Sequence, residues 1–210
     1  MPVDGPQYPV MLSLAGRRCL VVGGGPVAAR KVEGLVAAGA QITVIAPDVA
    51  NAIEATGVRI ERRPYRAGEA GDYRLVIAAS DDPQLNGLVY ADAEAAGVWV
   101  NSADDPEHCS FTLPAVVRRG PITVTVSTGG HSPALASWLR DQLGEAVGPE
   151  YEILLGLLAE RREALRSEGI PTEGMSWQDA LDSGMLDLVR AGRVAEARER
   201  LQACLSSSSD

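Results

Sequence analysis

The stretch RCLVVGGGPVAARK, residues 18–31, joins an apolar run, a row of glycines and the start of a helical pattern. The apolar run 18–22 predicts a buried strand, and the pattern from Val27 to Ala38 predicts a helix that Gly39 ends. Residues 23–28 match the motif G-x-G-x-x-A. In this motif Gly23 permits a tight turn, and Gly25 lets the backbone approach a pyrophosphate. We therefore predict a dinucleotide-binding unit, and the alternative is a glycine turn that only packs a helix against a strand.

Apolar runs and helical patterns continue to alternate outward from this unit. Further strands are predicted at 41–46, 58–62, 75–79 and 98–101, and helices at 49–55 and 83–96, the latter capped by Asp82. This alternation predicts an α/β fold with a Rossmann-type parallel sheet. A half-buried strand at 121–127 precedes a mostly helical remainder. We expect a first domain over 1–113, a small α+β segment over 114–147 and a helical domain over 148–210.

Composition excludes several classes of function. The 210 residues include 28 acidic and 19 basic side chains, a net charge of −9, and Lys31 is the only lysine. A phosphate-binding GK[ST] loop is therefore absent, and neither nucleic acid nor an anionic membrane is an expected partner. The three cysteines lie far apart, which argues against a disulfide framework or a cysteine zinc site. No apolar stretch suits a membrane span and residues 1–10 do not resemble a signal peptide, so we expect a cytoplasmic protein.

The end of the second predicted strand bears on the type of dinucleotide. It reads Ala46-Pro47-Asp48, and an acidic residue at this place accepts hydrogen bonds from the ribose hydroxyls in NAD sites. The alternative role for Asp48 is to cap the predicted helix 49–55. No arginine stands at that strand end to bind a 2′-phosphate, and the nearest basic residues are Arg30 and Lys31. The sequence therefore predicts NAD rather than NADP.

A polar segment follows the fifth predicted strand, where ligands bind in open α/β sheets. It contains Asn101-Ser-Ala-Asp104 and Ser110-Phe111-Thr-Leu-Pro114. Proton transfer needs a positioned acid or base, and four candidates lie here: Asp104, Asp105, Glu107 and His108. Spacing alone does not choose among them. A turn before Pro106 explains the two aspartates equally simply, and His108 suits a surface loop.

The turn Ser127-Thr-Gly-Gly-His-Ser132-Pro133 presents small residues before a predicted helix. Backbone N–H groups in such a turn can hold an anion such as a carboxylate, although the turn also suits an ordinary connection. Arg118, Arg119 and Arg140 supply nearby positive charge, unless the adjacent pair is simply a solvated turn.

Six motifs in register resemble the precorrin-2 dehydrogenase family, which includes the N-terminal module of siroheme synthases. They are Leu20-Val-Val-Gly-Gly-Gly25, Val27-Ala-Ala-Arg-Lys31, Ala78-Ala-Ser-Asp-Asp82, Asn101-x-x-Asp104, Ser110-Phe111-x-x-Pro114 and Val126-Ser-Thr-Gly-Gly130 with Ser132-Pro133. The resemblance covers about residues 8–140. It implies NAD-dependent oxidation of precorrin-2 to sirohydrochlorin in siroheme synthesis, with Asp104 handling the proton.

The resemblance also assigns binding roles. Cofactor contacts are implied for Gly23, Gly24, Gly25, Pro26, Val27, Pro47, Asp48, Ala79, Ser80 and Asn101. Because the substrate is a polycarboxylate, its contacts are expected at Ser127, Thr128, Gly129, His131, Arg118 and Arg119. Family members resemble intertwined homodimers, so 114–147 is expected to be a dimerisation segment.

Three questions stay open at the level of sequence. Some relatives insert iron into sirohydrochlorin, and no metal ligand is assigned here. Some siroheme synthases carry a phosphorylatable serine at the position of Thr128. The competing function is a non-enzymatic NAD(H)-sensing Rossmann module. A 2-hydroxy-acid dehydrogenase is a weaker alternative, because the two histidines do not lie in the context that such an enzyme needs.

Overall fold

The computed structural model describes residues 6–103 and 105–206, which form two compact units. The first unit runs to Leu113 and also includes Thr128–Ser132. The second unit contains Pro114–Ser127 and the chain from Pro133 onward. Each unit is described separately below.

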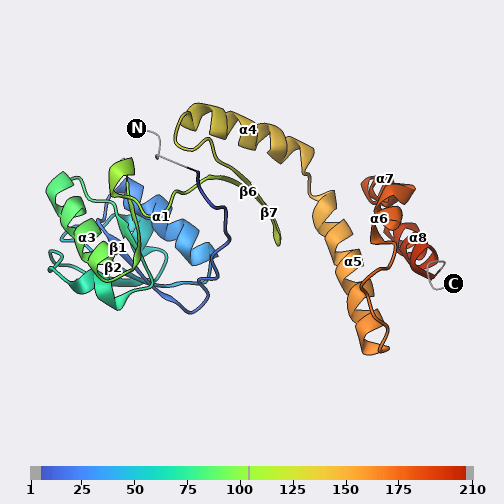
Figure 1. Cartoon of the computed structure of the whole chain (residues 1–210). Coiled ribbons are helices and arrows are strands. Elements are labelled where there is room, and N and C mark those ends of the chain that lie inside the picture. Colours follow the sequence, from blue (N-terminus) through green and yellow to red (C-terminus); the bar gives the residue numbers. More distant parts are fainter. Residues whose placement is uncertain (1–5, 104, 207–210) are drawn as a thin grey trace. The chain divides into compact units, whose positions relative to one another are not determined.

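The first unit is a parallel sheet with helices such as α1 and α3 beside it (Figure 1). The sheet has five strands in the order β3-β2-β1-β4-β5. The strands are β1 (Arg18–Val22), β2 (Gln41–Ile45), β3 (Arg59–Glu61), β4 (Leu75–Ala78) and β5 (Trp99–Ser102). The helices are α1 (Pro26–Ala37), α2 (Asn51–Glu54) and α3 (Pro83–Ala95), with short 3₁₀ turns η1 (Glu69–Asp72) and η2 (Pro106–His108). The predicted Rossmann-type sheet is confirmed. Of the predicted helices, only 49–55 is much shorter than expected.

Both faces of this sheet are buried, which explains the unbroken apolar runs in its strands. Val21, Val44 and Ile77 lie in one core cluster with the buried residues of α1. Leu20 and Val76 lie in a second cluster that includes buried residues of α3. Successive strands are added on one side of β1 as far as β3 and then on its other side from β4, so a ligand crevice is expected at the carboxyl ends of β1 and β4.

The second unit begins with an antiparallel hairpin, β6 (Ala115–Arg119) and β7 (Ile122–Val126), against which α4 (Pro133–Ala146) packs. Strand β7 is close to the predicted strand 121–127. Strand β6 was not predicted, because Arg118-Arg119 reads as a turn. The hairpin instead turns at Gly120, whose φ is 52°, and Pro121.

A helical cluster completes the second unit. It comprises α5 (Glu150–Ser167), α6 (Trp177–Ala180), the π-helical turn η3 (Leu181–Met185), α7 (Leu186–Arg190) and α8 (Val194–Ser206). Its core includes Leu157, Leu165, Met185 and Leu201, all nearly inaccessible to solvent. Across residues 6–103 and 105–206, no helix combines the length and apolarity that a bilayer crossing requires.

Candidate functional site

The glycine turn lies between the carboxyl ends of β1, β2 and β4. A Cβ on Gly23 would overlap the carbonyl oxygen of Ala79, and the φ of Gly23 is 121°. A Cβ on Gly24 would overlap the carbonyl oxygen of Asp48. Close backbone approach therefore requires glycine at both positions, independently of any ligand.

The start of α1 has the properties of an anion site. Gly25 is the N-cap residue, and a Cβ placed there would meet no atom within 4 Å. Pro26 occupies the first helical position, and the Ala29 N–H makes the first helical bond, 3.0 Å to the Gly25 carbonyl. The Val27 N–H therefore has no partner of the i−4 type within the helix. Open space, a free amide and the positive end of the dipole fit a pyrophosphate.

The end of β2 presents Pro47 and Asp48, which are both exposed. Helix α2 begins at Asn51 with Ala50 as its N-cap and no side-chain capping bond. The predicted capping role of Asp48 is therefore wrong, because the helix starts two residues later than such a cap requires. The Asp48 carboxylate remains suited to a ribose.

Two arginines that the sequence analysis overlooked follow β3, the neighbour of β2. Arg62 pairs with Glu54, and Arg63 donates from Nε to Glu61 and from a terminal nitrogen to Glu69, each at 2.9 Å. Arg63 holds the pKa of both Glu61 and Glu69 below the usual range. The strand order β3-β2 is what brings these residues toward the Asp48 end, and sequence distance concealed it.

Ser80 follows β4 and shapes the adjoining loop. Its hydroxyl lies 2.8 Å from Asn86 Oδ1, and its carbonyl accepts a 3.0 Å bond from Asn86 Nδ2. Asp82 accepts from the Gln84 N–H at 2.9 Å, which confirms the predicted cap of α3. Ala79 is buried beside Gly23. The predicted cofactor residues Ala79 and Ser80 thus lie at the same sheet edge as the glycine turn.

Asn101, near the end of β5, is a buried and hydrogen-bonded polar residue at the predicted nicotinamide end. Its side chain is 7 % exposed, and Nδ2 donates to the Phe111 carbonyl at 3.0 Å and to Cys109 Sγ at 3.3 Å. The Ser102 hydroxyl is buried without a hydrogen-bond partner among the described residues. Buried polar groups normally have partners, so an unsatisfied one at this edge is consistent with a ligand site.

The four candidates for proton transfer differ in what the structure shows of them. Asp104 lies outside the described residues. Asp105 Oδ2 lies 2.5 Å from His108 Nδ1, and the His108 ring meets the edge of Tyr90 at 4.8 Å between centroids. The hydrogen bond to His108 lowers the pKa of Asp105. Asp105 and His108 thus pair with each other, and Glu107 is exposed.

The predicted substrate turn contains hydrogen bonds among Thr128, His131 and Ser132 and two glycines with positive φ. Thr128 Oγ1 accepts from the Ser132 N–H and donates to the Ser132 carbonyl, each at 3.1 Å. The His131 N–H donates to the Thr128 carbonyl at 3.0 Å. Gly129 has a φ of 59°. Thr128, Gly129 and His131 belong to the first unit, whereas Ser127, Arg118 and Arg119 belong to the second.

Arg119 has a clear structural role in the second unit. Its guanidinium donates to the carbonyls of Val147 at 3.1 Å and Gly144 at 2.9 Å, which lie at the carboxyl end of α4. A cation at that end also complements the helix dipole. Sequence reasoning missed this capping role because Arg119 and α4 are far apart along the chain. Arg118 is exposed.

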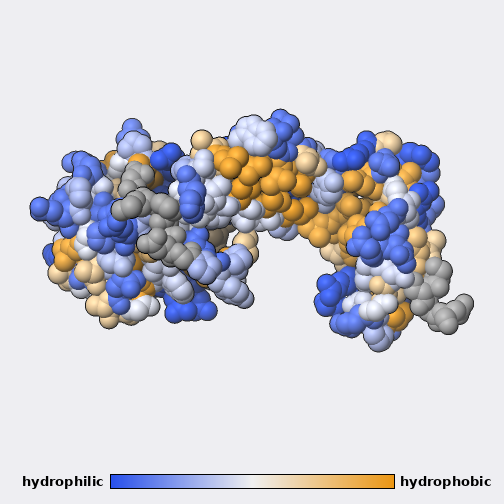
Figure 2. Space-filling view, turned by 45° about the horizontal axis from the view of Figure 1, so that its top comes forward, coloured by the Kyte–Doolittle hydropathy of each residue, from blue (hydrophilic) through white to orange (hydrophobic). Residues whose placement is uncertain are grey.

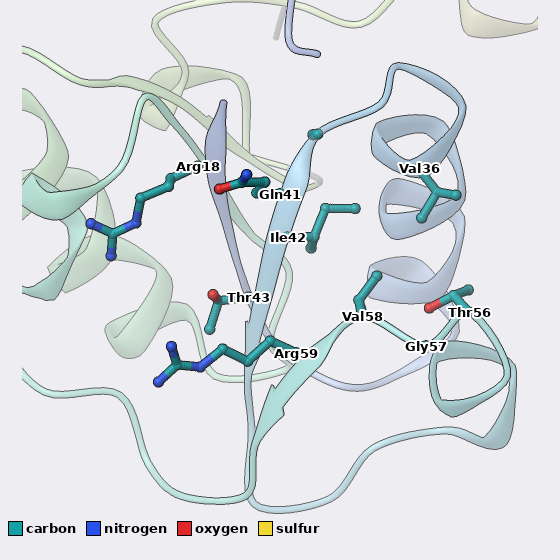
Figure 3. Close-up of a pocket in the computed structure, with 10 residues that line it drawn as sticks. Arg18, Val36, Gln41, Ile42, Thr43, Thr56, Gly57, Val58 and Arg59 are labelled. Atoms are coloured by element: carbon teal, nitrogen blue, oxygen red, sulfur yellow. The ribbon is translucent and has the colours of Figure 1, made fainter. Parts of the chain in front are cut away.

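Each of the two units has a surface hollow. One, of about 440 Å³, is lined by the first residues of β1, β2 and β3, Arg18, Gln41 and Arg59, among others (Figure 3). It therefore lies at the sheet edge opposite the glycine turn. The other, of about 360 Å³, belongs to the second unit, and its lining brings together Arg118, Arg119 and Arg140. Arg140 also pairs with Asp141 at 2.7 Å.

Comparison with known proteins places this geometry in context. Residues 10–115 match a family model described as "Putative NAD(P)-binding", and residues 119–146 match "Sirohaem biosynthesis protein central". A siroheme synthase of Nitrosococcus oceani is 41 % identical over 207 residues, and one of Pseudomonas putida is 38 % identical over 206. Each alignment covers 95 % of this chain and 44 % of the relative. The chain thus spans less than half the length of these relatives.

One solved structure is similar over nearly the whole chain. "SirC, precorrin-2 dehydrogenase" aligns with a TM-score of 0.71 at 27 % identity, covering 94 % of this chain and 100 % of its own. The similarity therefore includes the helical second unit as well as the dinucleotide-binding sheet.

Proposed function

Because the chain belongs to the putative NAD(P)-binding family, we propose that it oxidises precorrin-2 to sirohydrochlorin in siroheme synthesis, with NAD as hydride acceptor. The observation that carries this proposal is the similarity of 94 % of the chain to a precorrin-2 dehydrogenase. The open glycine turn and the polar end of β5 supply the groups that such a reaction needs.

The proposed reaction removes one hydride and one proton from the reduced macrocycle. A bound NAD would supply the hydride acceptor of this reaction. The amides at the start of α1 hold the pyrophosphate, the Asp48 carboxylate accepts from the ribose, and Asn101 orients the nicotinamide end. Asp104 accepts the proton. Together these residues align the cofactor with the carbon that loses the hydride.

NAD is favoured over NADP by the charges near the end of β2. A 2′-phosphate there would meet the Asp48 carboxylate rather than an unpaired cation. The arginines of the neighbouring strand end are already engaged with Glu54, Glu61 and Glu69. The other predicted cofactor contacts are Pro26, Val27, Pro47, Ala79 and Ser80, which support the proposal by their position at the same sheet edge.

Substrate carboxylates need cations that the overall charge of −9 does not provide. We assign them to the arginines that line the second-unit hollow, chiefly Arg118, because Arg140 also pairs with Asp141. The guanidinium of Arg119 is partly occupied by its bonds to the end of α4, so Arg119 has fewer N–H groups left for substrate carboxylates. The turn residues Ser127, Thr128, Gly129 and His131 are proposed as further substrate contacts.

A homodimer is part of the proposal, with residues 114–147 as its dimerisation segment between domains at 1–113 and 148–210. Hydrophobic side chains gather over α4 and the start of α5 (Figure 2). Trp138 is 58 % exposed and Ile153 is 45 % exposed. Apolar side chains gathered on a surface in this way suit an interface between copies of the chain.

Trp138→Asp is expected to convert the dimer into a monomer. The substitution places a charge in a proposed apolar interface, where desolvating it is costly. Size-exclusion chromatography with light scattering would measure the mass. The matched control is Leu88→Asp on the exposed side of α3, where Leu88 is 41 % exposed. A dimer that persists in Trp138→Asp would contradict the assignment of this face.

The proposed activity is tested by mixing the purified protein with precorrin-2 under anaerobic conditions. With NAD we expect one NADH for each sirohydrochlorin formed, followed by absorbance. With NADP at the same concentration we expect at least about tenfold lower kcat/KM, the cost of about 1.4 kcal/mol of charge repulsion. NAD binding without turnover would instead support the NAD(H)-sensing alternative, which the comparisons do not favour. Equal rates with NADP would contradict the assigned role of Asp48.

Two further aspects belong to the proposal. We propose a cytoplasmic location, which the absence of a disulfide framework among the scattered cysteines supports. Within the described part of the chain, no group of three histidine, cysteine or acidic side chains is arranged to hold a metal ion.

A further inference from the structure

The thiol of Cys109 is hydrogen-bonded to several groups at the end of β5. Its Sγ lies 3.3 Å from Asn101 Nδ2 and 3.3 Å from the Ser102 backbone nitrogen, and it accepts from both. The same sulfur lies 3.3 Å from the Ser102 carbonyl and 3.2 Å from the Asp105 carbonyl, so the thiol hydrogen can be donated to either. We propose that Cys109 is a positioning residue for the Asn101 amide at the cofactor site and for the backbone of Ser102 and Asp105, an inference that rests on the proposed function.

The first effect of Cys109 is on the orientation of the Asn101 amide. An asparagine amide has two hydrogens to donate, and here both are taken, one by the Phe111 carbonyl and one by the sulfur. A flipped amide would place Oδ1 against the Phe111 carbonyl, and two acceptors would repel each other. No donor among the described residues reaches Oδ1. Asn101 therefore offers an acceptor alone, which suits the N–H groups of a nicotinamide carboxamide.

The second effect is on the loop after β5. Ser102 and Asp105 stand on the two sides of Asp104 in the sequence, and the backbone of each contacts the same sulfur. Ser110 anchors the returning chain, because its hydroxyl accepts from the Val100 N–H at 2.7 Å and its own N–H donates to the Val100 carbonyl at 2.8 Å. One sulfur thus contacts the backbone of both Ser102 and Asp105.

The chemistry of a thiol suits this position. Burial raises the pKa of Cys109, so at neutral pH the group keeps the hydrogen that it donates. A serine hydroxyl also has one hydrogen to donate and lone pairs that accept. Its oxygen lies closer to Cβ than a sulfur does and makes shorter hydrogen bonds. Alanine removes every one of these contacts. Both Cys109→Ser and Cys109→Ala reduce the volume of the side chain, but only serine keeps a hydrogen-bonding group. A difference between the two variants therefore reports on hydrogen bonding.

NAD titration of the full chain by calorimetry is the first test, because it does not depend on the substrate. We expect Cys109→Ala to raise the Kd for NAD about 5–10-fold, the effect of losing one bond that orients Asn101. Cys109→Ser should recover most of the affinity. In precorrin-2 oxidation, Cys109→Ala should lower kcat more than it raises the KM for precorrin-2, since it removes contacts to the backbone of Ser102 and Asp105 and leaves the proposed substrate contacts in place.

Cys19→Ala is the matched control, because Cys19 is a fully buried thiol in β1 of the same unit. It should lower thermal stability and leave the Kd for NAD unchanged. The inference is overturned if Cys109→Ala binds NAD as the unmodified protein does, or if Cys19→Ala weakens binding equally. If the unmodified protein binds NAD but does not oxidise precorrin-2, the proposed function fails while the titration still decides the role of Cys109.

Discussion

Asp104→Asn is expected to lower kcat for precorrin-2 oxidation by about 10²–10⁴-fold, the usual contribution of a positioned acid or base. The amide has nearly the shape of the carboxylate but cannot accept the proton that leaves the macrocycle. Affinity for NAD should change little, because the proposed pyrophosphate and ribose contacts lie at α1 and at the end of β2. Anaerobic single-turnover spectroscopy, with NAD titration in parallel, measures both quantities.

Asp105→Asn provides the matched control for this prediction. It makes the same change of charge one residue later, and the Asp105 carboxylate already pairs with His108. We expect less than about a tenfold loss of rate, since an exposed pair of this kind contributes little. If Asp105→Asn were the inactive variant and Asp104→Asn retained its rate, the proton-transfer role would belong to the Asp105–His108 pair.

Most of the first unit could be predicted from the sequence because its physical signals are local. Strands buried on both faces appear as apolar runs, as in 18–22 and 75–79, and Gly39 and Gly97 both adopt positive φ just after α1 and α3. The hairpin strand β6 escaped prediction, since its exposed Arg118 and capping Arg119 hide the alternation of a half-buried strand.

Features of the site that depend on long-range contacts could not be predicted. The ion pairs of Arg62 and Arg63 become relevant to Asp48 only through the parallel order of β3 and β2. The contact between Cys109 and Asn101 requires the chain to fold back on β5, which no local pattern encodes. The motif assigns a tight turn to Gly23 and close approach to a ligand to Gly25. The structure adds a difference in packing, because a Cβ would overlap backbone atoms at Gly23 and Gly24 but would meet no atom within 4 Å at Gly25.

That difference leads to the second prediction, in which Gly25→Ala weakens NAD binding about 10–100-fold without unfolding the protein. The φ and ψ of Gly25, −81° and −173°, are accessible to alanine, and its Cβ would meet no protein atom within 4 Å. The methyl group instead occupies the space where we place the pyrophosphate. Losing charge-assisted bonds worth about 1.5–3 kcal/mol gives the stated range.

Two control variants separate ligand binding from packing in this experiment. Gly24→Ala forces a Cβ into the Asp48 carbonyl, so it should lower both thermal stability and NAD affinity. Gly34→Ala lies within α1 with open space at its Cβ, so it should raise stability by about 0.5–1 kcal/mol and leave affinity unchanged. Denaturant unfolding and NAD titration of all three variants measure the two effects independently. Full NAD affinity in a folded Gly25→Ala protein would mean that the pyrophosphate does not lie against this turn. The added methyl group meets no protein atom within 4 Å, so a ligand is all that it could displace.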